Sequence, residues 1–155
     1  MGVERSAGNE VATSAWPLDL ATFADDEGNA VRITVSGPSS TSADGLAAEI
    51  VVDTPFVSGQ LALFLPKWRL DAWGAALDRL AAGEDVTWLG VERGPTVWVR
   101  LTGERDCPEI LVEDDLVSMA SVRVPVDLPA DWIATHRRLL AAVLETQARE
   151  MRGVL

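Results

Sequence analysis

Residues 71–90, DAWGAALDRLAAGEDVTWLG, predict a helix that ends at a glycine and is followed by a short strand. Pro66 suits the first turn of this helix, and Gly83 suits a left-handed cap after it. Trp88 lies in the strand expected at 86–89. Four apolar side chains recur at spacings of three, four and three and form one helical stripe: Leu70, Trp73, Leu77 and Leu80. Trp73 and Trp88 are therefore predicted to belong to the core.

Four strands are expected before this helix, two in residues 16–37 and two in residues 47–65. Apolar and polar residues alternate from Val31 to Ser36, a period that sends one side of a strand inward. The acidic residues Asp25, Asp26 and Glu27 lie between the first two strands. They lack the spacing of a calcium loop, so we interpret them as a hairpin turn.

Three further strands and a second helix follow residue 90. Residues 94–103, GPTVWVRLTG, alternate clearly, with Trp98 and Arg100 on the same face, where the guanidinium can stack over the indole. Residues 108–127 predict two strands, and Pro125 places the second at an edge or near a strand end. Residues 127–153 predict an amphipathic helix.

These elements predict an α+β fold. The expected architecture is a curved, mostly antiparallel sheet in the order ββββ-α-β-βββ-α, with two helices packed on one face. A two-sheet arrangement is the alternative. Residues 1–15 are expected to form a disordered tail, and residues 16–155 a single domain.

The charge of the chain narrows its expected partners. The 155 residues carry a net charge of −11, and a surface this acidic repels phosphate backbones. We therefore expect no nucleic acid; a basic protein partner would be attracted, although the acidity can also serve solubility alone. One cysteine and no long apolar run predict a cytoplasmic protein with no membrane span.

Catalytic signatures are missing from the sequence. No phosphate-binding glycine loop, nucleophile elbow or zinc spacing occurs, so we expect no enzyme, no cofactor and no metal. His136, the single histidine, lies on or beside an apolar helical stripe and is interpreted as a packed residue. Cys107 is interpreted as incidental.

The densest charged stretch is ERDCPEILVEDD, residues 104–115, with six acids and one arginine. Two solvated loops would explain it. The alternative is a docking face for a basic protein, with these partner-binding residues: Glu104, Asp106, Glu109, Glu113, Asp114 and Asp115.

The stretches DDEGNAVRITVSG, AAEIVVDTPFVSGQLALFL and LDAWGAALDRLAAGEDVTWL carry a family resemblance. Over roughly residues 18–145 the chain resembles a family of small actinobacterial proteins of unknown function. In element order it is also similar to WapI-type immunity proteins, small antitoxins that pair a sheet with two helices. The resemblance implies packing motifs and no catalytic residues.

The predicted function is a non-enzymatic, cytoplasmic protein-binding module, in its sharpest form an immunity-type inhibitor of a basic toxin or effector. A small-molecule-binding protein or enzyme is the first alternative, with Trp98, Arg100 or His136 in the wall of a pocket between sheet and helices. A structural subunit of a homo-oligomer is the second. A partner-facing role for Trp68, which lies off the helical stripe, also stays open.

Overall fold

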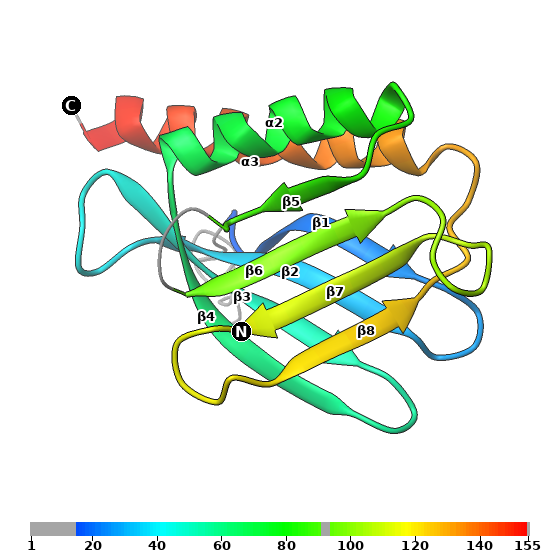
Figure 1. The fold of residues 1–155 in the computed structure, drawn as a ribbon. Helices are drawn as coiled ribbons and strands as arrows, with labels where there is room; N and C mark the ends of the chain where they lie inside the picture. Colours follow the sequence, from blue (N-terminus) through cyan, green and yellow to red (C-terminus); the bar gives the residue numbers. More distant parts are fainter. Residues whose placement is uncertain (1–14, 91–93, 155) are drawn as a thin grey trace, which may run out of the picture.

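A computed structural model describes residues 15–90 and 94–154, which form two antiparallel sheets and two helices (Figure 1). Sheet A has the order β1-β2-β3-β4, with bounds Leu18–Ala24, Ala30–Pro38, Gly45–Asp53 and Ser58–Pro66. Sheet B has the order β5-β6-β7-β8, with bounds Val86–Trp88, Pro95–Arg100, Glu109–Asp114 and Ser121–Pro125. Helix α2 spans Lys67–Ala81 and helix α3 spans Trp132–Val154. The predicted tail at 1–15 lies outside the described residues, except for Ala15.

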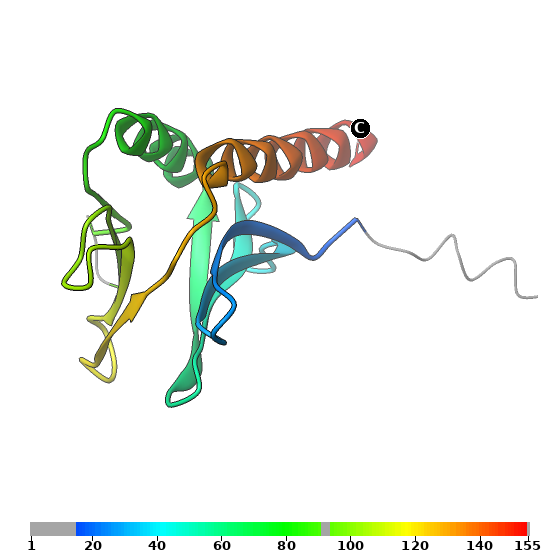
Figure 2. The same cartoon turned by 90° about the vertical axis from the view of Figure 1, so that its right-hand side faces the viewer.

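The two sheets face each other, and both helices lie across one side of the space between them (Figure 2). The predicted α+β class and the order ββββ-α-β-βββ-α are confirmed. The single curved sheet with both helices on one face is corrected to the two-sheet alternative. Alternation fixes which side of a strand is buried, but it does not say whether that side meets a helix or another sheet. Here α2 carries the chain from β4 of sheet A to β5 of sheet B.

Helix α2 buries the predicted stripe. Leu70, Trp73, Leu77 and Leu80 are buried, together with Ala76. The helix ends as expected at a left-handed glycine: Gly83 has a φ of +89° and donates its N–H to the carbonyl of Leu80.

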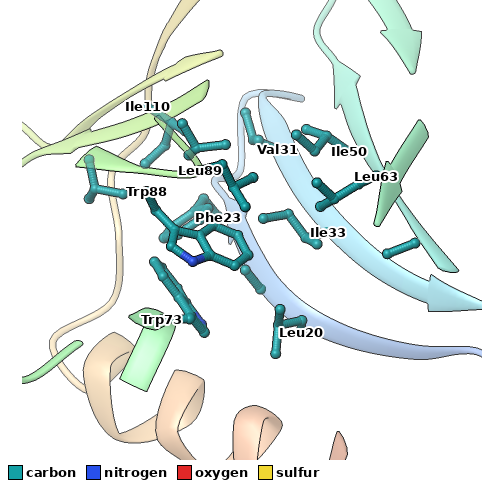
Figure 3. Close-up of a cluster of buried hydrophobic side chains, with 14 of the residues drawn as sticks. Leu20, Phe23, Val31, Ile33, Ile50, Leu63, Trp73, Trp88, Leu89 and Ile110 are labelled. Atoms are coloured by element: carbon teal, nitrogen blue, oxygen red, sulfur yellow. The ribbon is translucent and has the colours of Figure 1, made fainter. Parts of the chain in front are cut away.

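The two tryptophans lie in the core, as predicted (Figure 3). The rings of Trp73 and Trp88 are 4.9 Å apart, and Phe23 of β1 meets Trp73 edge-on at 6.4 Å. The indole N–H of Trp88 donates to the carbonyl of Arg69 at 3.0 Å. Among the described residues, the buried indole N–H of Trp73 has no hydrogen-bond acceptor. These rings join α2, sheet A and sheet B in one cluster.

Helix α3 packs along β1, the edge strand of sheet A nearest to it. His136 Nε2 accepts the backbone N–H of Thr22 at 3.0 Å, and Nδ1 lies 2.6 Å from the carbonyl of Trp132. The imidazole stacks on Phe23 at 4.7 Å. The interpretation of His136 as a packed residue is confirmed, because it is buried and both ring nitrogens contact the backbone.

Candidate functional site

The six predicted partner-binding acids lie at the two ends of β7. Glu104 and Asp106 are exposed in the loop before the strand, and Glu113, Asp114 and Asp115 lie at and after its other end. Because a strand rises about 3.4 Å per residue, the two groups are about 17 Å apart. They therefore form two acidic ends of one strand rather than a compact cluster.

Glu109 lies at the first of these ends, in a buried position. Only 1% of its surface is exposed, and its carboxylate lies 3.6 Å from Arg100 Nη1 and 3.7 Å from Arg123 Nε. Arg123 also pairs with Glu104. Gly103 packs against this carboxylate, and a Cβ there would lie 2.7 Å from Glu109 Oε2. Glu109 thus holds two arginines in place and offers little surface of its own.

Asp114 is also committed to its own chain. Its carboxylate accepts the backbone N–H groups of Leu116, Val117 and Ser118 and the hydroxyl of Ser118. These hydrogen bonds, led by that of the Ser118 hydroxyl, lower the pKa of Asp114 to about 2. Asp114 therefore fixes the turn between β7 and β8.

Glu113 belongs to a polar network with Trp98 and Arg100. The indole N–H of Trp98 donates to Glu113 Oε1 at 2.8 Å, and the guanidinium of Arg100 lies 5.7 Å from the indole centroid. The predicted stacking of Arg100 over Trp98 is confirmed. All three side chains are partly exposed and share one side of neighbouring strands.

We call this side the outer face of sheet B and define it by six residues: Trp98, Arg100, Glu104, Glu109, Glu113 and Arg123. Figure 1 looks onto it, and neither helix crosses it. Hydrogen bonds and ion pairs hold these side chains in defined positions, so the face is ordered before any partner arrives. Such an arrangement can bind a charged surface.

Three hollows bear on the alternative that the protein binds a small molecule in a pocket. One hollow of about 430 Å³ lies between α2 and β5, another of about 820 Å³ lies beside the β1–β2 turn and Cys107, and a third of about 320 Å³ lies between the sheets near β4. Trp98, Arg100 and His136 line none of these three hollows. Trp98 and Arg100 lie on the outer face of sheet B, and His136 lies in the core.

The acidic residues at 25–27 form a hairpin turn, as predicted. Asp25 accepts the backbone N–H groups of Glu27 and Asn29 and the side-chain amide of Asn29. Within residues 15–90 and 94–154, no group of three or more His, Cys, Asp or Glu side chains could hold a metal ion. The described helices include none that is long and apolar enough to span a membrane.

Two surface features escaped the sequence reasoning. The hollow between α2 and β5 has an apolar floor with the half-exposed ring of Trp68 at its side, and Arg69 lies over that ring at 5.1 Å. The sequence did hint at this hollow, because Trp68 lies off the buried stripe of the helix. The other feature is the edge of β4. In the sequence it could have been recognised from nine consecutive residues without a charge.

Comparison with known families identifies a match over most of the chain. The model of the "Family of unknown function (DUF5959)" matches residues 18–148. Comparison with curated proteins and with solved structures gives no match for the chain.

Proposed function

Since the chain belongs to the DUF5959 family, whose function is unknown, we propose a function from its structure: a non-enzymatic protein-binding module that holds a basic partner on the outer face of sheet B. The observation that carries the proposal is the open network of Trp98, Arg100 and Glu113 on a strand face that no described helix covers. Tryptophan and arginine are the residues that most often dominate binding energy at protein interfaces.

Charge supports a basic partner. The chain has a net charge of −11, and Glu104, Asp106 and Asp115 are exposed around the ends of β7. Oppositely charged surfaces raise association rates and suppress wrong partners. Glu109 and Asp114 support the face from within. In its sharpest form the proposal is an immunity-type inhibitor of a basic toxin or effector in the cytoplasm, a form supported by this acidity and suggested by the resemblance in element order to WapI-type immunity proteins that the sequence predicts.

The experiment starts by identifying the partner and then measures its affinity. Native affinity purification with mass spectrometry supplies candidates, and biolayer interferometry measures the purified partner against the Glu113→Lys/Asp115→Lys and Trp98→Ala variants. We expect Trp98→Ala to lower the affinity for the partner at least thirtyfold. This corresponds to about 2 kcal/mol, the binding energy typical of a residue that anchors an interface. The charge-reversed variant should also lose affinity, and more salt should narrow its difference from the unmodified protein.

The matched control reverses two exposed acids elsewhere, with Asp44→Lys/Glu145→Lys, and changes the net charge by the same amount. Equal losses in both charge variants would mean that total charge drives binding and would remove the outer face of sheet B from the proposal. Circular dichroism checks that each variant folds.

A second candidate function rests on the hollow between α2 and β5. Its volume of about 430 Å³ and its apolar floor of Ala72, Ala75 and Trp88 suit a small ligand. A thermal-shift screen tests it, since a ligand that binds only the native state raises the melting temperature. A hit that Ala75→Trp abolishes would favour this function over protein binding. Light scattering on the same samples tests the homo-oligomer alternative.

A further inference from the structure

The four sheet edges differ in how they are protected. Helix α3 lies along β1, where His136 accepts the N–H of Thr22. Strand β5 has three residues, and β8 has five with Arg123 and Pro125 among them. Short length, charge, proline and a covering helix are the usual ways in which proteins keep an edge from pairing with another chain.

Among the described residues, the charged protection of strand β4 is confined to its end, where Arg69 Nη1 donates to the carbonyl of Phe64 at 3.0 Å. Its nine residues, SGQLALFLP, carry no charge, and the proline is the last of them. They pair with β3 residue by residue, without a bulge, from Ser58 opposite Asp53 to Pro66 opposite Gly45. Ser58, Gly59 and Gln60 are exposed. The outward backbone groups from Ser58 to Ala62 can therefore accept another strand.

An apolar hollow lies beside the first half of β4, between the two sheets. It holds about 320 Å³ and is lined by Ile50 and Val52 of β3 and by Val112 and Val122 of sheet B. Gly59 lines it as well and faces inward, because it pairs with the buried Val52. A Cβ at Gly59 would meet no atom within 4 Å. The alternate side chains of an added strand could fill this space.

The opposite side of β4 favours basic side chains. Ser58 and Ala62 point outward, directly opposite Asp53 and Glu49 of β3. An added strand would lie about 9.6 Å from β3, two strand spacings away. Because Ser58 and Ala62 are small, a lysine or arginine on that strand can reach across them toward the two carboxylates.

We propose that β4 binds an extended segment of a partner protein as a fifth strand of sheet A. The segment alternates apolar side chains, which enter the hollow, with basic side chains, four residues apart, which face Asp53 and Glu49. A second copy of this chain fits less well, because β4 itself has no basic residue and its Leu63 and Leu65 are already buried in its own core. This site is separate from the outer face of sheet B and does not depend on the function proposed for it.

The probe is a synthetic peptide, acetyl-KVTVKVTVK-amide, titrated into isotope-labelled protein and followed by NMR and amide hydrogen exchange. We expect saturable binding that protects the outward amides of Ser58, Gln60 and Ala62, which do not pair with β3, and leaves those of β8 unchanged. A peptide of the same composition without the alternation, acetyl-KKTTKVVVV-amide, should bind at least tenfold more weakly.

Two variants separate the contacts. Gly59→Leu fills the hollow, so it should weaken peptide binding at least tenfold while raising the melting temperature, which shows that the fold is intact. Glu49→Lys/Asp53→Lys should weaken binding at low salt, whereas the control Asp44→Lys/Glu145→Lys, which changes the net charge by the same amount, should not.

Three results would overturn the proposal. The first is an unchanged peptide affinity in Gly59→Leu. The second is a set of NMR chemical-shift changes at Trp98 and its neighbours instead of at β4, which would assign the peptide to the outer face of sheet B. The third is an edge already occupied in the free protein, seen either as protection of the outward amides of Ser58, Gln60 and Ala62 in the monomer or as a dimer that Ala62→Lys dissociates.

Discussion

His136 shows how one side chain can close a sheet edge. A strand at the edge of a sheet leaves backbone N–H groups unpaired, and a buried unpaired N–H destabilises the fold. The neutral imidazole solves this for Thr22, because Nε2 accepts at 3.0 Å while Nδ1 contacts the carbonyl of Trp132. Phe23 stacks on the ring and excludes water. This role requires the neutral form of the histidine.

The stability of the protein should therefore fall in mild acid. Burial lowers the pKa of His136 below its usual 6.5, against the opposing effect of the carbonyl of Trp132 beside Nδ1. A lowered pKa in the folded state means that the contribution is complete above pH 6.5 and decreases as the pH falls below it. Urea unfolding from pH 8 to 5 measures this change.

The control for this prediction is His136→Phe, which keeps a ring against Phe23 but cannot titrate. The free energy of unfolding of the unmodified protein, relative to this variant, should decrease below pH 6.5 by at most about 1.4 kcal/mol per pH unit. A difference that stays constant from pH 8 to 5 would contradict the prediction.

At the scale of elements, most strands and both helices were predictable from the sequence. The alternation from Val31 to Ser36 and the leucine stripe before Gly83 each report burial within one element. The division into two sheets was not predictable in this way, because it depends on which apolar side faces which. The same limit applied to the acidic stretch, in which Glu109 and Asp114 were both predicted to be exposed. Glu109 is buried by arginines from two other strands, and Asp114 is buried by the backbone of the turn that follows it.

The contact between α2 and sheet B gives a matched pair of substitutions. Trp73→Phe and Trp88→Phe remove the same atoms from one buried cluster. Trp88 loses a hydrogen bond to the carbonyl of Arg69, whereas Trp73 loses an indole N–H that has no acceptor among the described residues. We expect Trp88→Phe to lower the free energy of unfolding by about 1 kcal/mol more than Trp73→Phe does. Chemical denaturation followed by circular dichroism measures both, and equal losses would show that this hydrogen bond contributes nothing net.

At the scale of the whole molecule, the two sheets and both helices share one cluster of buried side chains. A chain of ring contacts runs through this cluster: His136 of α3 contacts Phe23 of β1, Phe23 contacts Trp73 of α2, and Trp73 contacts Trp88 of β5. Loosening one sheet would therefore expose the apolar side of the other. The outer face of sheet B points away from this cluster, so surface changes on that face leave the core intact, whereas β4 contributes Leu63 and Leu65 to the cluster.

This shared core predicts that residues 16–155 unfold as one cooperative unit. Because neither sheet can keep its buried side dry alone, denaturation curves from tryptophan fluorescence, which reports the core, and from far-ultraviolet circular dichroism, which reports helices and strands, should coincide. Calorimetric and van't Hoff enthalpies should also agree. Trp73→Ala is the decisive variant: it should destabilise the fold by about 3–5 kcal/mol and shift both curves together. Curves that separate in this variant, with sheet A outlasting sheet B, would show that the two sheets are independent units.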